Sequence, residues 1–351
     1  MTAPERMTAF LLENGGPSVQ LRVKREITSS ITAEEENVLL SEIMTEPVYR
    51  LVSGCQKENG WLGNGFHGPN KNAGPYENQE VGTKYLAEKG FGKENAVLSR
   101  AMEAFVTVPL SDLCYRTHGK IYDEFQFAAN GQNLIRCACI ARAGFDDVID
   151  ITPQVQLSLD SFRRVLEVDS ILDVSRTIKS SKYRLFQKNE KWPCRYHFDI
   201  LAHTECWKTP ENCQMLSQAF EKLMRRDRPE LLGVGAASWV GHVLGTLGCY
   251  TEGFSARIEK DGRSLIQLET IEWLCRCGLY PYLPVLREEV GILMDSVDAD
   301  GICRAAVDEE FLRGISTYGG QQIEADWKTQ LRRSCDITFR ALLCGKYAGI
   351  V

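Results

Sequence analysis

The sequence predicts an all-α protein in which helical hairpins form an inner and an outer ring, an α/α toroid (barrel) of one domain covering residues 1–351. Three observations lead to this prediction. Short phrases containing glycine recur along the chain, each closes an apolar helical segment, and a more amphipathic segment follows each one. An inner helix packed on both sides and an outer helix exposed on one side require this alternation, although an open solenoid would show it too.

The recurring phrase is LAEKGF at residues 86–91, IARAGF at 140–145 and LCRCGL at 274–279. Each version carries glycine at its fifth position. Glycine enters the left-handed backbone region without strain, so it is common directly after a helix. We therefore predict that an inner helix ends just before each of these glycines.

A second, amphipathic helix is predicted after each phrase, over residues 93–105, 153–167 and 284–296. A fourth hairpin is predicted from a helix over 196–207 and a second one capped by Thr209, with proline at its first position.

Helices are also predicted at both ends of the chain. Thr32 and Glu35 form a capping box that opens an early helix, and Pro47 bends or ends that helix. A last helix over about 329–346 is apolar on one face and would close the ring. No strand-like alternation of useful length occurs.

Composition sets limits on the class of protein. Apolar residues make up 44% and charged residues 25% of the chain, as in ordinary globular proteins. The net charge of −6 argues against a basic surface, so we expect no nucleic-acid partner. The segment 231–251 lacks charged side chains but contains five glycines, and we expect a buried helix there and no membrane span.

The thirteen cysteines predict free thiols in a reducing compartment. No stretch near the start has the pattern of a secretory signal, so we expect a cytoplasmic protein. The C-x-C pairs lack the spacing of a zinc site, and no metal or cofactor is predicted.

Gln56 is followed by Gly60 and Trp61, and the segment 298–303 holds the equivalent place with isoleucine and cysteine in place of tryptophan. These loops resemble the glutamine–tryptophan repeat of the squalene cyclases and protein prenyltransferases, which are built as α/α toroids. The segments 14–23 and 192–197 add to a resemblance that covers about residues 10–345. It implies that the glutamine caps helix ends and that the indole packs between hairpins.

The acids and metal ligands of that group are not reproduced. The Asp-x-Asp-Asp run with which class II terpenoid cyclases begin their reaction is missing, because Asp300 is followed by glycine. The run from Asp146 to Asp150 formally matches a diphosphate-binding motif, but acidic residues in such a turn favour the next helix N-terminus. Asp112, Cys114 and His118 are of zinc-ligand types, and we favour an ordinary loop there.

The segment 192–205 concentrates the most chemistry. On a helix, Tyr196, Asp199 and His203 share one stripe, and His197 lies beside them. A carboxylate that orients an imidazole is a plausible acid–base pair, so we predict His197, Asp199 and His203 as catalytic. A buried hydrogen-bonded network that joins hairpins is the alternative.

Polar and aromatic residues near the starts of inner helices are predicted to bind the substrate. They are Trp61, His67, Tyr76, Glu80, Trp192, Tyr196, Glu269, Asp326, Trp327 and Arg332. His67 belongs to the glycine-rich loop 63–68, just before a predicted inner helix.

Three functions remain open at this point. The first is an enzyme of terpenoid-cyclase-like type that acts on a largely apolar small molecule, an isoprenoid or a polycycle, in a central cavity. The second is a toroid without catalysis that binds a ligand or a protein. The third is a carbohydrate-active hydrolase or lyase that pairs Glu80 with Glu269 or Asp326. The oligomeric state is not predicted.

Overall fold

The computed structural model describes residues 1–67, 74–108, 127–170, 173–177, 184–186, 190, 192–224, 254–317 and 319–351, and for 127–132, 175–177 and 184–186 it describes the backbone alone. The predicted segment 231–251 and the candidate zinc ligands Asp112, Cys114 and His118 lie outside these residues.

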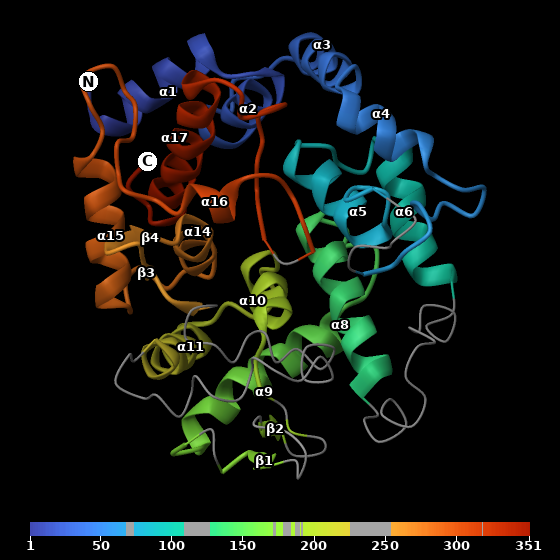
Figure 1. Cartoon of the computed structure of the whole chain (residues 1–351), viewed down its shortest axis with the longest axis vertical. Coiled ribbons are helices and arrows are strands. Elements are labelled where there is room, and N and C mark those ends of the chain that lie inside the picture. The colour runs from blue at the N-terminus through green and yellow to red at the C-terminus, as the bar shows by residue number, and fades with distance from the viewer. Residues whose placement is uncertain are drawn as a thin grey trace. The chain divides into compact units, whose positions relative to one another are not determined.

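The prediction of an all-α protein is confirmed, because helices make up most of the structure (Figure 1). The helices before the chain midpoint are α1 (Ala3–Asn14), α2 (Pro17–Arg22), the π-helix η1 (Val23–Ile27), α3 (Ala33–Met44), α4 (Pro47–Gly54), α5 (Gln79–Glu88), α6 (Ala96–Thr107), α8 (Phe127–Arg142) and α9 (Thr152–Glu167). The later ones are α10 (Arg195–Ala202), α11 (Pro210–Leu223), α14 (Leu268–Arg276), α15 (Pro284–Asp295), α16 (Glu309–Leu312) and α17 (Gln330–Tyr347).

Two short hairpins supplement the helices. Strands β1 (Ser175–Thr177) and β2 (Arg184–Phe186) pair antiparallel, with Arg176 opposite Leu185. Strands β3 (Arg257–Lys260) and β4 (Arg263–Ile266) form the second sheet. Each strand has only three or four residues, too few for the alternating pattern to be recognised in the sequence.

The three glycine-ended helices occur as predicted. Helices α5, α8 and α14 end two residues before Gly90, Gly144 and Gly278, whose φ angles are 88°, 69° and 71°. These positive angles are the reason for glycine at the fifth position of the phrase. The amphipathic helices predicted after them are α6, α9 and α15.

The predicted caps are also present. The Thr32 hydroxyl accepts a hydrogen bond from the Glu35 amide, and Thr209 and Thr329 cap α11 and α17 in the same way. One boundary differs from its prediction: α10 ends at Ala202, and His203 is its C-cap, so the helix is shorter than the predicted 196–207.

The described chain groups into two compact units. The first unit consists of Met1–Thr107, Ile258–Arg276 and Pro284–Val351. At its centre α17 packs against α1, α2, α14 and α15, while α5 packs against α6 (Figure 1). The second unit consists of Val108–Arg257 and Cys277–Leu283, and there α9 packs against α10 and α11, while α8 packs against α10.

Two turns of the first unit have the same construction, as the predicted repeat implies. Gly60 and Gly301 both have a φ of 84°, and a Cβ atom at either one would lie within 2.3 Å of the carbonyl oxygen of an arginine on a neighbouring helix. These arginines, Arg100 on α6 and Arg6 on α1, donate back to carbonyl oxygens of the turns. The sequence 298–303 is therefore equivalent to the Gln56–Trp61 turn in geometry, although its tryptophan is replaced.

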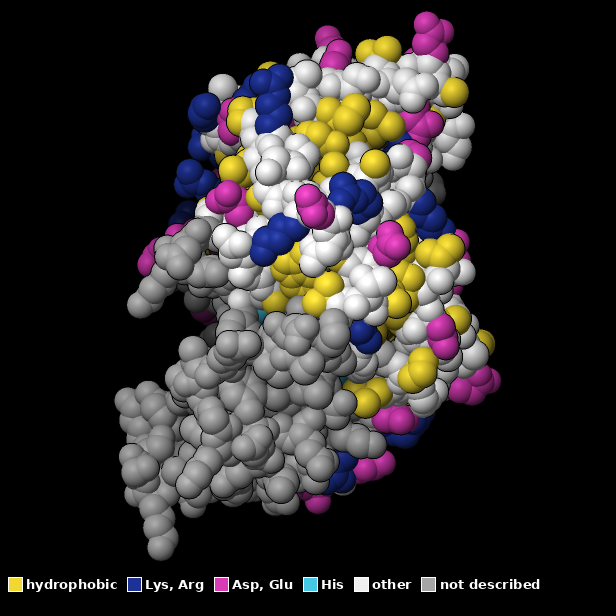
Figure 2. Space-filling model, turned by 90° about the vertical axis from the view of Figure 1, so that its right-hand side faces the viewer, with side chains coloured by type: hydrophobic (Ala, Val, Ile, Leu, Met, Phe, Trp, Pro, Cys, Tyr) yellow, Lys and Arg dark blue, Asp and Glu magenta, His cyan; other side chains and the backbone are white. Residues whose placement is uncertain are grey.

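In the described parts of the chain, none of the helices combines the length and the apolar composition that a bilayer crossing needs. On the face shown in Figure 2, apolar side chains lie in patches between charged ones. A shallow groove of about 710 Å³ follows the outer face of α3, between Ala33 and Thr45. Its lining includes two titratable side chains, Glu34 and Glu42, both acidic.

Candidate functional site

Helix α10 carries the most chemically dense segment of the sequence, and its two faces differ. Phe198 faces the core of the second unit, where its ring centroid lies 4.7 Å from that of Phe220 and 6.2 Å from that of Phe254. Tyr196, Asp199 and His203 belong to the other stripe of the helix. Packing of the apolar face therefore fixes the orientation of α10, and the orientation of α10 decides the direction of its polar stripe.

Asp199 is the centre of a buried cluster in the second unit. Arg142, on α8, donates from Nε to Oδ1 at 3.1 Å and from Nη2 to Oδ2 at 2.9 Å. The Asp199 side chain is 2% exposed and that of Arg142 4% exposed. A two-pronged contact of this kind, removed from water, holds the carboxylate in one orientation.

His203 completes the cluster, as the i, i+4 spacing predicts. Its Nδ1 lies 2.8 Å from the backbone oxygen of Asp199 and 3.0 Å from Oδ1 of the same residue. A carbonyl oxygen can only accept a hydrogen bond, so Nδ1 carries the proton, and the lone pair of the neutral ring lies on Nε2. The predicted carboxylate–imidazole contact is thus made by Asp199 and His203.

His197 has different surroundings. Its Nδ1 accepts a hydrogen bond of 2.9 Å from the Cys194 amide at the start of α10, and Nε2 lies 3.5 Å from the Ser161 hydroxyl. Burial lowers the pKa of His197 to about 3, because a charged ring would lose its surrounding water. The ring is neutral at physiological pH, and we assign it a structural part as a helix cap.

Arg195 adds a second guanidinium to this cluster. The pKa of Arg195 is lowered to about 10, mainly by burial. The neighbouring Asp199 opposes this shift, and the positive charge of Arg142 adds to it. Two cationic side chains therefore surround one carboxylate in this part of the second unit. Trp192 and Tyr196, both predicted to bind substrate, precede Asp199 on the same segment, Trp192 buried and Tyr196 half-buried.

A second carboxylate–histidine contact lies in the first unit. Glu80, in the first turn of α5, has its Oε2 atom 2.6 Å from Nδ1 of His67 and its Oε1 atom 2.7 Å from Nζ of Lys84. Burial raises the pKa of Glu80, but the charges and hydrogen bonds of Lys84 and His67 outweigh it and lower the pKa to about 2. The structure therefore brings the predicted residues His67 and Glu80 together.

Aromatic residues surround the loop that carries His67. The Trp61 ring lies 6.0 Å from Phe66 and 5.9 Å from Phe105. The Gln56 amide donates to the carbonyl oxygens of Gly60 and Val97, which ties the turn to the start of α6. Gln56 and Trp61 thus both hold this turn against α6.

Tyr76 lies in the first unit as well. Its ring packs edge-on against Tyr85 at 5.6 Å. Burial raises the pKa of Tyr76, so its hydroxyl stays protonated at physiological pH.

The remaining predicted binding residues belong to other surroundings. Asp326 pairs with Arg332 and Lys328 at a partly exposed position, where hydrogen bonds from Arg332 and from the Lys328 amide lower its pKa to about 2. Trp327 donates from its indole nitrogen to the buried carboxylate of Asp336. Glu269 lies fully buried on α14. The proposed pairing of Glu80 with Glu269 or Asp326 stays a prediction.

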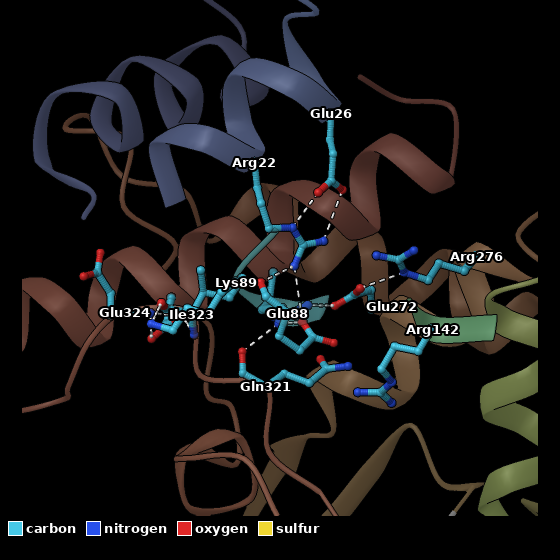
Figure 3. Close-up of polar contacts among 12 residues, drawn as sticks. Arg22, Glu26, Glu88, Lys89, Arg142, Glu272, Arg276, Gln321, Ile323 and Glu324 are labelled. Carbon is cyan, nitrogen blue, oxygen red and sulfur yellow. Dashed lines mark hydrogen bonds and ion pairs between the residues drawn. The ribbon is translucent and has the colours of Figure 1, made fainter. Parts of the chain in front are cut away.

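The largest polar network of the first unit contains three arginines and three glutamates (Figure 3). Arg340, on α17, donates to Glu272 at 2.9 Å and to Glu88 at 2.5 Å. Arg22 connects Glu88 to Glu26, and Arg276 pairs with Glu272 at 2.8 Å. The charges balance within this set, and we interpret it as a structural link between α2, α5, α14 and α17.

The acidic turn between α8 and α9 bears on the diphosphate-binding interpretation. No group of three or more His, Cys, Asp or Glu side chains is arranged as metal ligands within the part of the chain that the structure describes. Asp150 accepts a hydrogen bond of 2.9 Å from the Thr152 amide at the start of α9, which lowers its pKa. The acidic turn therefore accepts a hydrogen bond from the N-terminus of α9, the role that its position in the sequence predicts.

Sequence reasoning missed the cationic partners, Arg142 and Lys84. Lys84 was visible as the i, i+4 neighbour of Glu80. No sequence signal connects Arg142 to Asp199, because the two residues are 57 positions apart.

Comparison with known proteins adds no family: no family model, no curated protein and no solved structure matches this chain significantly.

Proposed function

We propose that the protein is an enzyme that moves a proton to or from a largely apolar small molecule, with Asp199 and His203 as its proton-transfer pair. The observation that carries the proposal is the fixed tautomer of His203. Because Nδ1 donates to two oxygens of Asp199, the lone pair of the neutral ring lies on Nε2, the atom that would accept the proton.

Asp199 acts as a positioning residue in this proposal. Its carboxylate stabilises the imidazolium that forms when Nε2 takes the proton, and Arg142 keeps the carboxylate from rotating away. The proton that moves is the one bonded to the substrate or to a solvent molecule beside it. The reverse step returns it from Nε2 to a neighbouring atom of the substrate, so that no co-reactant is required.

The charges indicate which substrate would fit. Arg142 and Arg195 lie near Asp199, and their guanidinium groups are hydrogen-bond donors, so a carbonyl or hydroxyl oxygen on the substrate would be stabilised there. Trp192 and Tyr196 offer aromatic surface for the rest of the molecule. We therefore favour an isoprenoid or polycyclic compound that carries one oxygen function.

Two observations weigh against the Glu80–Asp326 form of the carbohydrate-active alternative. A glycosidase needs one carboxyl group whose pKa is raised, so that it can donate a proton at neutral pH. Glu80 has a pKa of about 2, and Asp326 has the same low pKa from its contact with Arg332. A toroid that binds a ligand without turning it over is the second candidate, and the absence of an Asp-x-Asp-Asp run favours it.

Deuterium exchange tests the proposal without knowledge of the product. The protein is incubated in D2O with linear terpene alcohols, squalene-like polyenes and polycyclic ketones, and deuterium bound to carbon is measured by mass spectrometry. We expect exchange in at least one compound with the native protein and a loss of at least about a hundredfold in His203→Gln, as for a general base.

The matched control is Asp160→Asn, which changes a half-exposed carboxylate of the same unit that pairs with Arg163. It should keep full exchange. Exchange that survives both His203→Gln and Asp199→Asn would remove the pair from the mechanism. Thermal stabilisation by one of these compounds without any exchange would establish the binding function in place of the enzyme.

We also propose that the hairpins form the closed α/α toroid that the sequence pattern predicts. The equivalence of the turns at Gly60 and Gly301 supports a repeat architecture. A compact chain of this length has a radius of gyration of about 20 Å, whereas an open solenoid is longer. Small-angle scattering in solution measures this radius, and a clearly larger value would contradict ring closure.

A further inference from the structure

Helix α3 has two different faces. Its inner face buries Leu39, Leu40 and Ile43, and the helix packs against α2 and α4. The outer face carries the groove of about 710 Å³ and lies at the edge of the first unit in Figure 1. The groove is lined by Ala33, Glu34, Asn37, Val38, Ser41, Glu42 and Thr45.

Val38 lies in the middle of this groove. Its side chain is 52% exposed, and Glu34 and Glu42 lie one helical turn before and after it. Valine is a poorer helix former than alanine, lysine or glutamate, so helix formation gives no reason for a valine here. Packing within the first unit gives none either, because α3 contacts α2 and α4 with its opposite face. A partner that covers the groove would explain the apolar side chain.

The acidic side chains of α3 differ in their partners. Glu35 and Glu36 form ion pairs with cationic side chains of η1, and these contacts hold α3 in place. Within the described ranges of the chain, Glu34 and Glu42 have no ion-pair partner, so they leave two negative charges in the groove uncompensated. Along the helix axis these two residues are about 12 Å apart.

Glu42 is placed against the preference of its own helix. It lies in the last turn of α3, where the free carbonyl groups carry partial negative charge and disfavour an anionic side chain. Glu34 lies in the first turn, where an acidic side chain is favourable. The position of Glu42 therefore costs helix stability, and a cation brought by a partner would remove this cost.

The charge of the groove decides among its possible occupants. If two copies of the chain met through antiparallel α3 helices, Glu34 of one copy would lie near Glu42 of the other, and these like charges repel. Nucleic acid and anionic lipid carry the same sign as the groove and are disfavoured for the same reason. The net charge of −6 adds to the attraction of a basic partner.

We propose that this groove docks a basic amphipathic helix of another protein. An apolar side chain of that helix packs on Val38, and lysine or arginine one turn before and one turn after it pairs with Glu34 and Glu42. Both helices have the same rise, so the spacing matches in either direction of the partner. The proposal does not rest on Asp199 and His203, which belong to the second unit, whereas α3 belongs to the first.

Fluorescence anisotropy with two labelled peptides tests the proposal on the full-length protein. Both peptides are alanine-rich helices of identical composition. In the first, a leucine has one lysine a turn before it and one a turn after it on the same face, and in the second both lysines lie on the opposite face. We expect saturable binding of the first peptide with a dissociation constant below about 1 mM, weakened by salt. The second should bind about fivefold more weakly, because two exposed ion pairs are lost.

Two variants of the groove separate binding from folding. Glu42→Lys should weaken binding of the first peptide by about fivefold or more and yet raise the melting temperature, since it places a cation in the last turn of α3. Val38→Ala should weaken binding by about threefold, because packed apolar area is lost, although alanine is the better helix former. The control is Glu288→Lys on the exposed face of α15, which makes the same change in net charge and should leave binding unchanged.

Two results would overturn the proposal directly. Equal binding of the two peptides, or of the native chain and Glu42→Lys, would mean that the attraction is non-specific. A first peptide that does not saturate below about 1 mM would leave the groove without this partner. Sedimentation of the native protein and flotation with phosphatidylserine vesicles cover the other occupants. A dimer or a vesicle complex that Val38→Ala weakens would assign the groove to a second copy or to a lipid surface instead.

Discussion

The two carboxylate–histidine clusters contain the same three groups but obtain them in opposite ways. At Glu80 the cation is local, since Lys84 lies one turn further along α5, and the histidine comes from a loop 13 positions earlier. At Asp199 the histidine is local, and the cation comes from α8, 57 positions earlier.

The difference shows which contacts a helix supplies by itself. An i, i+4 partner is brought near by helix formation alone, whereas a partner on another segment depends on tertiary packing. We therefore expect a substitution of the distant partner to lower the free energy of unfolding more than a substitution of the local partner. The distant partner connects the carboxylate to another helix or loop, and this connection is lost with it.

The largest expected effect is the removal of the distant cation. Arg142→Met should lower the free energy of unfolding by about 3–5 kcal/mol, because the buried Asp199 carboxylate loses the two hydrogen bonds of its ion-pair partner. Lys84→Met should cost about 2 kcal/mol, since the Glu80 carboxylate loses one hydrogen bond where Asp199 loses two, and the Thr317 carbonyl oxygen loses its bond from Lys84 as well. Urea unfolding measures both.

Arg163→Met is the control, because Arg163 is 43% exposed and its contact with Asp160 should contribute at most about 1 kcal/mol. A larger loss in Lys84→Met than in Arg142→Met would reverse the comparison.

Acid should next weaken the Glu80 cluster. The folded-state pKa of about 2 lies below the ordinary value of 4.5, so Glu80 contributes stability that is present above pH 4.5 and lost as pH falls through 2. At about 1.4 kcal/mol per pKa unit, the contribution is at most about 4 kcal/mol. Glu80→Gln should lose this dependence between pH 5 and 2, measured by urea unfolding against the native chain. If the free energy of unfolding changed with pH in the same way in both proteins, Glu80 would not be the source of this dependence.

Glu324 provides the opposite case, a buried carboxyl for which the described residues supply no ion pair. Burial raises its pKa to about 7, the Gly16 amide that donates to it at 2.7 Å lowers the pKa, and the nearby Asp336 raises it. The stability that Glu324 contributes is therefore fully present below pH 4.5 and is lost as pH rises through 7, by at most about 4 kcal/mol. Lys89 and Arg332 face it with weaker influence.

Unfolding at pH 5.5 and 8.5 measures this loss, with Trp327 fluorescence as a local signal. Glu324→Gln mimics the protonated group and should flatten the dependence. If that variant kept the dependence of the native protein, another group, with Asp336 the first candidate, would be responsible.

The smallest effects are expected from the imidazoles. His203→Gln and His67→Gln should each cost about 1 kcal/mol, because each carboxylate keeps its cation. His67→Gln should cost more, since it also releases a loop, and thermal unfolding of the two variants compares them. Equal losses would mean that the loop contributes nothing.

Much of the secondary structure could be predicted from the sequence alone. Gly90, Gly144 and Gly278 mark helix ends because a positive φ favours one residue type, and Thr32, Thr209 and Thr329 mark helix starts because their hydroxyls cap free amides. Both signals are local, so they can be read without knowledge of the fold.

The site was predictable only in part, for the same physical reason. Asp199 and His203 could be paired by their spacing on one helix, and the glycine-rich loop marked His67. The partners Arg142 of Asp199 and His67 of Glu80 come from other segments, and only packing decides that they meet. Burial, which makes His197 a neutral cap and raises the pKa of Glu324, is likewise a property of the folded chain and not of any short stretch of its sequence.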